Sequence, residues 1–303
     1  MLDKTWLITG GTGSFGKEAV KTLLNEYKPK KVIVFSRDEL KQFEMSNDLN
    51  DDRVRYFIGD IRDYKRLRMA LEGVDICIHA AALKQVPTAE YNPFECVKTN
   101  IIGSQNVIQA CIDLNVERVI ALSTDKAVHP VNLYGKTKAV MENLFIAANH
   151  YAKHTALSVV RYGNVEGSRG SVLPMFKEQA KTGTLYVTDQ NMTRFWITLN
   201  EGVRFVLYAL SKMTGGEIFV PKLRSKKIVD IARDIAPECN IEYTGIRPGE
   251  KIHETLIAQE EAYRTVEFDN NYIIHPAISY FKYSAGHGRP VHDAFEYTSK
   301  GVE

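Results

Sequence analysis

The sequence has few cysteines, and none of them forms a Cys-x-x-Cys pair. There are four in 303 residues, and Cys77 and Cys111 lie within apolar stretches. This pattern predicts buried free thiols in a reducing cytoplasm and argues against a disulfide framework or a zinc site. The eight histidines also lack the spacing of metal ligands, so we expect no metal centre.

Long apolar runs and an excess of one charge are also missing. No segment approaches the roughly eighteen apolar residues that a membrane span needs. The net charge of +2 creates no strong basic field for nucleic acid or an anionic membrane. The chain starts with MLDKTWLITGG, which enters an apolar strand pattern without a signal peptide. We therefore expect a globular cytoplasmic protein with neither nucleic acid nor a membrane as partner.

Near its start, the chain contains three evenly spaced glycines between a strand pattern and a helix pattern. Gly10, Gly13 and Gly16 lie in KTWLITGGTGSFGKEAVKTLL, residues 4–24. Glycines at this spacing allow a tight turn and a close approach of backbone to a pyrophosphate, and the following helix points its N-terminal amides at the phosphates. The candidate dinucleotide contacts in this turn are Gly10, Thr12, Gly13, Ser14, Phe15 and Gly16.

Strand and helix patterns alternate through the first half of the chain. Such alternation, with helical segments of about ten or more residues, predicts a parallel, doubly wound sheet with right-handed crossovers. The fold class is therefore α/β, with a Rossmann-type doubly wound parallel sheet. After the first strand, strands are expected at 30–36, 53–60, 74–82, 117–123 and 156–164, and helices at 38–49, 92–114 and 134–152.

After Gly163 the regular alternation breaks, which predicts a smaller mixed α/β lobe that binds the substrate. Residues 1–163 are assigned to the Rossmann domain, and residues 164–198 and 239–303 to the lobe. The pattern NEGVRFVLYALSKM reads as a helix, so residues 199–238 are expected to return in part to the first domain.

The end of the second expected strand bears on the choice of dinucleotide. NAD enzymes usually have Asp or Glu there to bind the ribose 2′-hydroxyl, but this chain has Ser36 and Arg37, with Lys41 one turn later. A guanidinium forks onto a phosphate that a carboxylate would repel, so NADP is favoured over NAD. Asp38 keeps a plain surface loop as an alternative. Asp60, after the third strand, is either a partner for the adenine amino group or a helix N-cap.

The segment STDKAVHPVNLYGKTK, residues 123–138, holds four groups suited to proton transfer. Tyr134 and Lys138 are four residues apart and share one face of a helix, while Asp125 and Lys126 follow a buried strand. An unperturbed tyrosine has a pKa of about 10, and a nearby ammonium and a cationic nicotinamide favour its phenolate. Tyr134 can then remove a hydroxyl proton as hydride leaves the same carbon. The structural alternative is a charged loop followed by a solvated helix.

Nine motifs spread over nearly the whole chain carry a family resemblance. They are TGGTGSFG, FSRDELK, AAALKQVP, KTNIIGSQNV, STDKAVHPVNLYGKTK, RYGNV with SRGSVLP, MTRFWIT, EIFVPK and RPGEKIHE. With them the sequence resembles the extended short-chain dehydrogenase/reductases, and within these the inverting UDP-N-acetylglucosamine 4,6-dehydratases that open the pseudaminic acid pathway in bacteria. Simple dehydrogenases of this group usually have a catalytic Ser or Thr before the tyrosine helix. Here Thr124 is followed by Asp125 and Lys126, the pair that marks dehydratases.

The resemblance implies a dehydration in which NADP is recycled. Oxidation at C4 of the sugar makes the C5 proton acidic, and Lys126 is then the expected base, with Asp125 the acid that protonates the leaving C6 hydroxyl. A lysine acts as a base near neutrality only if its pKa falls by about 3 units. Burial beside Lys138 and a cationic cofactor is expected to push the Lys126 pKa down, and a low-dielectric pocket is expected to keep Asp125 neutral.

The resemblance also implies further contacts. For the UDP-sugar diphosphate we expect Arg194 and Arg247, because an arginine fork matches phosphate oxygens. Glu250 is expected at the uridine ribose and Asn164 at the diphosphate or sugar, and a structural salt bridge is the alternative for each arginine. Lys84 is expected beside the nicotinamide pocket, or else as a plain loop lysine. The remaining expected contacts with cofactor or substrate are Ile61, Ala80, Ala81, Asn100, Ser123, Thr124, Tyr134 and Lys138.

Two features depart from the family pattern. Glu166 stands where relatives usually have an apolar residue, so we expect it to point away from the diphosphate or to pair with Arg169. The chain also ends where relatives usually continue for a short segment. A retaining 4,6-dehydratase, a 4-epimerase and a noncatalytic NADP-binding sensor stay open as alternatives. By analogy with relatives, a homo-oligomer, either a dimer or a hexamer, is expected.

Overall fold

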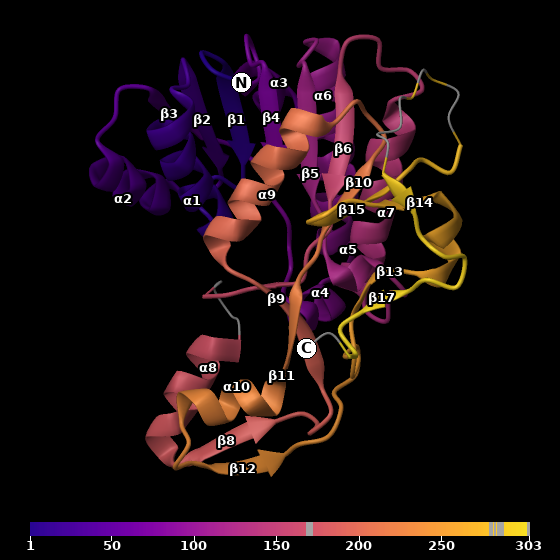
Figure 1. Ribbon diagram of the computed structural model, residues 1–303. Coiled ribbons are helices and arrows are strands. Elements are labelled where there is room, and N and C mark those ends of the chain that lie inside the picture. The colour runs from indigo at the N-terminus through magenta and orange to yellow at the C-terminus, as the bar shows by residue number, and fades with distance from the viewer. Residues whose placement is uncertain (168–171, 279–280, 282, 284–287, 302–303) are drawn as a thin grey trace.

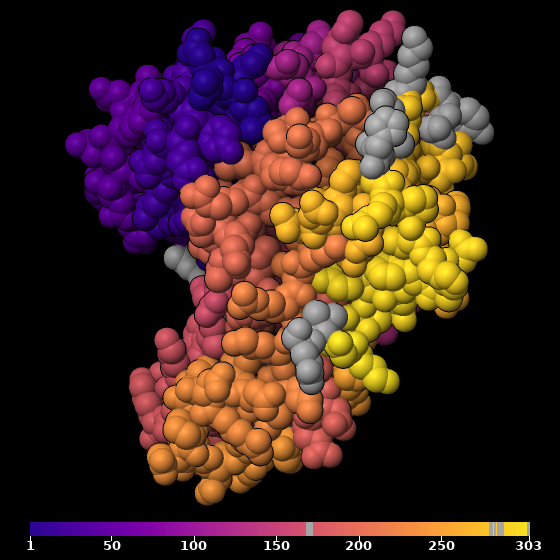
Figure 2. All heavy atoms as spheres, viewed as in Figure 1, coloured from indigo at the N-terminus to yellow at the C-terminus, as the bar shows by residue number. Residues whose placement is uncertain are grey.

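The computed structural model describes residues 1–167, 172–278, 281, 283 and 288–301. An α/β body built on a large sheet forms the larger part, and a smaller lobe projects from it (Figure 1). Figure 2 shows the two parts as a broad body and a narrower lobe joined by a waist. The doubly wound α/β fold expected from the sequence is confirmed.

Within the described residues, ten strands form the main sheet in the order β16-β14-β15-β10-β6-β5-β4-β1-β2-β3. The strands from β3 to β10 are parallel, and β15, β14 and β16 add an antiparallel edge. The bounds are β1 Thr5–Thr9, β2 Lys31–Ser36, β3 Val54–Ile58, β4 Ile76–His79, β5 Arg118–Leu122, β6 Ala156–Val160, β10 Ile218–Pro221, β14 Thr265–Glu267, β15 Asn271–Ile274 and β16 Arg289–Pro290.

The central strands are apolar because helices cover both faces of the sheet. All five residues of β1 are buried, and Trp6, Leu7 and Ile8 are completely inaccessible to solvent. Burying one such side chain contributes roughly 1.5–3 kcal/mol, so these strands hold the body together. Cys77 on β4 and Cys111 are buried free thiols, as predicted.

The helices lie in the expected order. The long helix expected at 92–114 is a continuous run of α5, η2 and α6, and α9, which crosses in front of the sheet in Figure 1, packs against α1. No helix in the described part of the chain is long and apolar enough to cross a membrane. The bounds are α1 Ser14–Thr22, η1 Leu23–Tyr27, α2 Glu39–Leu49, α3 Tyr64–Ala70, α4 Val86–Tyr91, α5 Pro93–Val97, η2 Lys98–Ile102, α6 Gly103–Asp113, η3 Asp125–Ala127, α7 Leu133–Ala148 and α9 Leu199–Lys212.

The lobe has a small hydrophobic core of its own. Phe176, Leu185 and Ile231 are among its buried residues, and they come from a helix, a strand and a second helix. A three-stranded sheet, β11-β9-β7, connects the lobe to the body. The bounds are β7 Asn164–Val165, α8 Val172–Gln179, η4 Ala180–Thr182, β8 Thr184–Val187, β9 Thr193–Ile197, β11 Arg224–Lys227, α10 Ile228–Ile235 and β12 Asn240–Tyr243.

The chain crosses between the two parts more often than the expected domain boundaries allow. Within residues 199–238, helix α9 and strand β10 belong to the body, whereas α10 packs in the lobe. The segment 265–290, expected in the lobe, instead supplies β14, β15 and β16 to the main sheet. Two further short strands, β13 Thr255–Ile257 and β17 Tyr297–Thr298, pair with each other beside η5 Gln259–Arg264. The two-domain division itself stays a prediction.

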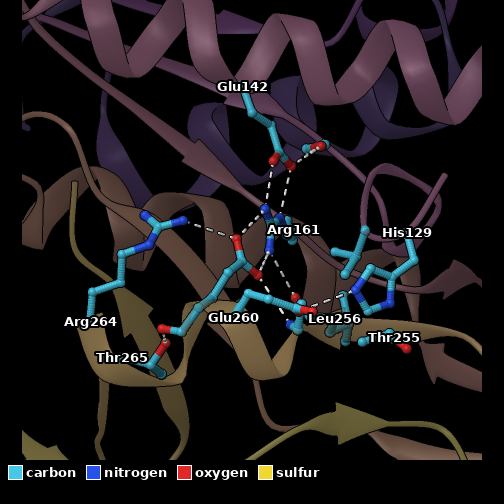
Figure 3. Close-up of polar contacts among 12 residues, drawn as sticks. His129, Glu142, Arg161, Thr255, Leu256, Glu260, Arg264 and Thr265 are labelled. Carbon is cyan, nitrogen blue, oxygen red and sulfur yellow. Dashed lines mark hydrogen bonds and ion pairs between the residues drawn. The ribbon is translucent and has the colours of Figure 1, made fainter. Parts of the chain in front are cut away.

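A buried network of ion pairs joins η5 to the body, at α7 and at the end of β6 (Figure 3). Arg161, directly after β6, donates to Glu142 of α7 at 2.7 and 2.9 Å and to Glu261 of η5 at the same two distances. Arg264 donates to Glu261 at 3.2 Å. Burial would lower the pKa of Arg161, but the two carboxylates outweigh it and raise that pKa. Breaking a buried pair of this kind typically costs about 3–5 kcal/mol.

Candidate active site

A cavity of about 1140 Å³ lies between the carboxyl ends of the parallel strands and the lobe, the place where open α/β sheets bind ligands. Nearly all of the site residues expected from the sequence line it. They are Gly10, Thr12, Gly13, Ser14, Phe15, Gly16, Ser36, Arg37, Lys41, Asp60, Ile61, Ala80, Ala81, Lys84, Ser123, Thr124, Lys126, Tyr134, Lys138, Asn164, Arg194, Arg247 and Glu250.

The glycine turn after β1 is too crowded for side chains. Gly10 has a φ of +67°, and a Cβ there would lie 2.9 Å from the backbone of Ala81; a Cβ on Gly16 would lie 2.4 Å from the carbonyl oxygen of Gly11. Helix α1 begins after Gly13 without a side-chain cap, which leaves its first amides available to an anion. The turn therefore fits the pyrophosphate of a dinucleotide.

The end of β2 presents one cation to the cavity. The side chain of Arg37 is 55% exposed, and its Nη1 lies 3.6 Å from Oδ2 of Asp60. Ser36 is buried, and its hydroxyl accepts a hydrogen bond from Gln42 at 2.9 Å. Asp38 caps α2 by accepting from the backbone amide of Lys41 at 3.0 Å, so its carboxylate has a structural task.

Asp60 is not a helix N-cap, which settles one of the two alternatives. Asp63 caps α3 instead, by accepting from the Arg66 amide at 3.0 Å. Asp60 accepts from the backbone and side chain of Arg62, both at 2.9 Å. Burial would raise the pKa of Asp60, but the bonds to Arg62 outweigh it and lower that pKa. Asp60 thus stays an anion at the cavity wall.

Asn100 was expected to contact the cofactor, but it is buried and does not line the cavity. Its amide group accepts from the Leu83 amide at 2.8 Å and donates to the Leu83 carbonyl at 2.9 Å and to Thr137 at 3.0 Å. Asn100 therefore shapes the loop after β4, which carries Lys84 to the cavity. Burial, followed by the charge of Lys126, lowers the pKa of Lys84.

The expected catalytic groups come together at one wall of the cavity. Asn132 starts α7 by accepting from the Gly135 amide at 2.8 Å, and this places Tyr134 and Lys138 on the cavity face. Lys126, in the single turn η3, directs its ammonium at Asp125 at 3.0 Å and at Asn164 at 3.4 Å. Its side chain is 25% exposed, so it does not point into bulk solvent.

Asp125 is fully buried and lies behind Lys126 rather than on the cavity wall. Its Oδ1 accepts from the hydroxyl of Thr124 at 2.9 Å and from Lys126. Among the described residues, its Oδ2 has no hydrogen-bond partner. Buried polar atoms are normally paired, so this oxygen stands out as an unsatisfied acceptor.

The pKa of Lys126 shifts in the opposite direction to the expected one. Burial would lower this pKa, but the charges of Asp125 and Glu254 outweigh burial and raise it, against a small opposing effect of Arg194. The sequence-based expectation counted the cations around Lys126 and missed the second carboxylate. A free amine at Lys126 therefore requires its proton to move to a neighbouring group.

Tyr134 and Lys138 are both shifted by burial. Burial raises the pKa of Tyr134 to about 12, against the lowering effects of Lys126 and of a hydrogen bond with Thr124. Burial lowers the pKa of Lys138 to about 8, and Glu142, one helical turn away, opposes this. In the protein itself, Lys126 rather than Lys138 is thus the cation that favours the phenolate.

The two arginines expected to bind the diphosphate both line the cavity, but in different settings. Arg194 on β9 is buried, and its Nη1 donates to the carbonyls of Thr193 at 2.7 Å and Ile252 at 3.1 Å. Arg247 is 55% exposed, and its Nε lies 3.9 Å from Glu250. Arg194 is thus fixed in place, whereas Arg247 stays available to an incoming anion.

A polysaccharide biosynthesis protein family model matches residues 6–276. The chain belongs to this family. A relative from Campylobacter jejuni (strain 81-176), named UDP-N-acetylglucosamine 4,6-dehydratase (inverting), is 54% identical over 98% of this chain and 92% of its own length. The resemblance read from the motifs is thereby confirmed. A relative from Rickettsia conorii, named UDP-glucose 4-epimerase, is 43% identical over 100% of this chain and 92% of its own length.

Two solved structures show the same fold. The X-ray structure of Pen from Bacillus thuringiensis has a TM-score of 0.93 and 38% identity, and it covers 99% of this chain and 94% of its own. The dTDP-glucose 4,6-dehydratase DesIV from Streptomyces venezuelae, solved with NAD and TYD bound, has a TM-score of 0.73 and 23% identity over 82% and 86% of the two chains.

For this member of the polysaccharide biosynthesis family, the residues that sequence reasoning missed in the cavity wall include a buried carboxylate, Glu254. The signal was its place at the end of the motif RPGEKIHE. The unusual Glu166 is exposed and does not line the cavity, and its amide donates to the Ile197 carbonyl at 2.8 Å. Its expected partner Arg169 lies outside the described residues.

Proposed function

We propose that this chain is a UDP-N-acetylglucosamine 4,6-dehydratase that inverts C5 and yields UDP-2-acetamido-2,6-dideoxy-β-L-arabino-hex-4-ulose for pseudaminic acid-type sugar synthesis in the cytoplasm. The observation that carries the proposal is the ion pair of the buried Asp125 with Lys126, 3.0 Å apart at a cavity that Lys126 and Tyr134 line. Elimination of water needs an acid and a base together, and the name of the Campylobacter relative supports this reaction.

Tyr134 begins the reaction by taking the proton of the C4 hydroxyl. A nicotinamide held in this cavity would supply a reversible hydride acceptor for C4 and C6, so it would be recycled within each turnover. The raised pKa of Tyr134, about 12, means that the phenolate forms only when positive charge gathers around it. Burial lowers the pKa of Lys138 to about 8, and this side chain would suit the nicotinamide ribose hydroxyls.

The ion pair can supply both the base and the acid by an internal proton transfer. When the Lys126 ammonium gives its proton to Asp125, the products are a neutral amine and a neutral carboxylic acid. The amine then takes the C5 proton. Because Lys126 separates Asp125 from the cavity, the proton of the acid passes through Lys126 to the departing C6 hydroxyl, which leaves as water. The pair returns to its ionic form, so no proton is gained or lost overall.

The end of the reaction follows from the same balance. The reaction would end with return of the hydride to C6 of the unsaturated ketone and with addition of a proton from solvent to C5, on the face opposite to the one that lost its proton. Lys126 serves one face only, because Asp125, Glu254 and Asn164 hold its ammonium. Protonation from the other face inverts C5.

We propose NADP as the dinucleotide. Arg37 is the exposed cation at the end of β2, and Lys41 lies one turn further along the same cavity wall. A 2′-phosphate would draw Arg37 from its 3.6 Å contact with Asp60, because a phosphate carries more charge and matches the guanidinium fork. Ser36 can add a hydroxyl contact.

The UDP-sugar would lie across the lobe side of the cavity. Arg194 and Arg247 would provide positive charge for its diphosphate, and Asn164, which accepts from Lys126 at 3.4 Å, lines the same cavity. Glu250, which accepts from Thr188 at 3.3 Å, can accept from the uridine ribose. Lys84, which lines the same cavity, would contact the sugar or the nicotinamide.

A 4-epimerase is the second candidate, favoured by the name of the Rickettsia relative. An epimerase keeps the C6 hydroxyl and has no use for the acid–base pair of Asp125 and Lys126. A retaining dehydratase would return the C5 proton to the original face. A noncatalytic sensor would bind the dinucleotide without converting any UDP-sugar.

One experiment separates these candidates: NMR of the product made from UDP-N-acetylglucosamine in heavy water with no added reductant. We expect a 4-keto-6-deoxy sugar with deuterium at C5 and inverted configuration. Retained configuration identifies the retaining enzyme, a product with its C6 hydroxyl identifies the epimerase, and binding without turnover identifies the sensor.

We also propose a homo-oligomer, either a dimer or a hexamer. Large apolar side chains lie exposed on neighbouring helices of the body, among them Tyr91 at 88% and Phe94 at 62%, and exposed apolar clusters mark association surfaces. Light scattering that gives a monomer mass at micromolar concentration would contradict this proposal.

A further inference from the structure

Glu254 stands out because it is a buried carboxylate in contact with the reacting lysine. Its side chain is 2% exposed, and its Oε1 lies 3.4 Å from Nζ of Lys126 and 3.8 Å from Nε of Arg194. Its Oε2 lies 2.9 Å from Nζ of Lys251. One carboxylate therefore holds three cations, and one of them is the proposed base.

The backbone of Glu254 is fixed from a distant part of the chain. Its amide donates to the hydroxyl of Ser299 at 2.9 Å, and its carbonyl accepts from the Ser299 amide at 2.8 Å. Ser299 is completely buried and also bonds Thr193, next to Arg194, at 2.7 Å. The pairing of β13 with β17 extends this clamp. Glu254 therefore cannot swing away from the cavity wall without breaking it.

Lys126 consequently lies between two carboxylates, Asp125 on one side and Glu254 on the other. The proposed reaction uses Asp125 as the proton acceptor within the pair and leaves Glu254 unused. When the proton moves from Lys126 to Asp125, Glu254 stays negative, and its field continues to attract that proton. A second negative charge of this kind opposes loss of the proton to solvent.

We propose that Glu254 is a positioning residue that keeps one proton on the Asp125–Lys126 pair and holds the Lys126 ammonium at the cavity wall. The inference rests on the proposed dehydratase function and deepens it. The pair can form a neutral amine and a carboxylic acid together only while the Lys126 amine and the Asp125 carboxylate share one proton between them. Glu254 therefore widens the range of pH over which both are present.

Some of the charged groups around Lys126 raise its pKa and others lower it. Asp125 from η3 and Glu254 beside β13 attract its proton, and Arg194 from β9 opposes them. Lys84, on the loop after β4, is near enough for the charge of Lys126 to lower its pKa. Tyr134 from α7 faces the same ammonium. When a neutral group replaces Glu254, Asp125 alone of these two carboxylates remains to raise the pKa of Lys126.

The test compares wild-type enzyme with E254Q and E254D by following deuterium entry at C5 of UDP-N-acetylglucosamine across pH. E254Q keeps the size and removes the charge, so the alkaline limb of its profile is expected to fall by about 1–3 pH units. E254D keeps the charge but draws it back by one methylene, so a smaller fall is expected. E267Q is the matched control, since Glu267 pairs with Lys222 at 2.7 Å on the sheet edge, and its profile should equal that of wild type.

A second readout separates this role from a general structural one. C4 oxidation, followed by the absorbance of the reduced nicotinamide, depends on Tyr134, and its pH dependence should move less in E254Q than that of C5 exchange, because Lys126 acts on Tyr134 only through its charge. The inference is overturned if the alkaline limb of the C5-exchange profile does not move in folded E254Q. It is also overturned if the limbs for C5 exchange and C4 oxidation move equally. If thermal melting shows that only E254D folds, an unmoved limb in E254D overturns it. Wild-type enzyme that forms no 4-keto-6-deoxy product refutes the proposed function, whereas normal wild-type turnover with unmoved variants refutes the inference alone.

Discussion

The two ends of the cavity are built in different ways. The dinucleotide end consists largely of backbone: the turn at Gly10 and the uncapped start of α1 come from one short segment. The elimination end consists of side chains from η3, α7, β7 and the segment before β13. A local turn needs only its own residues, whereas Lys126 takes its properties from Asp125 and Glu254 together. The two ends should therefore fail differently when they are changed.

The largest effect is expected at the elimination end. Lys126→Ala should slow C5 exchange by about 10²–10⁴-fold, because the base is removed, and should slow C4 oxidation by Tyr134 less, because that step loses only a neighbouring charge. The measurement is deuterium exchange at C5 beside the absorbance of reduced nicotinamide. Lys136→Ala, an exposed position on α7, is the control. Exchange at the wild-type rate in Lys126→Ala would exclude Lys126 as the base.

The next effect is expected at the dinucleotide end. Gly10→Ala forces a side chain onto backbone at φ +67° with a 2.9 Å clash against Ala81, so cofactor affinity should fall by roughly 100-fold, equivalent to strain of about 3 kcal/mol. Fluorescence titration with NADPH measures it. Gly73→Ala is the control, because Gly73 shares a positive φ but has open space around it. Equal losses in both variants would show that the crowding at Gly10 has no role.

Replacing Lys138 tests whether the buried charge of a catalytic group lowers the free energy of unfolding. Burial lowers its pKa to about 8, so the unfolded chain binds more protons than the folded one between about pH 8 and 10.5, and the cost of the buried charge disappears as pH rises through that range. Lys138→Met should therefore stabilise the protein at pH 7 by about 1–3 kcal/mol, with a gain that shrinks toward pH 10.5. Urea unfolding measures this, with Lys136→Met as control. A pH-independent gain would point to packing instead of charge.

The smallest effect is expected at Arg37. Arg37→Ala should weaken NADP binding by about 10-fold, the value of roughly one charge-assisted hydrogen bond, and leave NAD binding unchanged. Competition of NADP with NAD in the titration measures the ratio. Arg55→Ala on β3, whose side chain bonds to nearby backbone carbonyls, is the control. A loss of equal size for both cofactors would remove the basis for proposing NADP.

The sequence was most informative where function follows from local order. The glycine turn, the strands around it and the face shared by Tyr134 and Lys138 are set by spacing along the chain, and the structure places them as expected. It was least informative where groups meet across the fold. Asn100 turned out to brace the loop at Leu83 instead of lining the cavity, because its side chain faces a neighbouring segment.

The sequence by itself determined the doubly wound sheet, the phosphate turn and the residues available for proton transfer, because periodicity and spacing act over a few residues. Only the tertiary structure decided which charged groups surround Lys126 and therefore in which direction its pKa shifts. The clamp from Ser299 brings Glu254 to Lys126, although these residues are far apart in the chain. Electrostatic energy depends on distance in space and on burial, and neither can be read from the order of the residues.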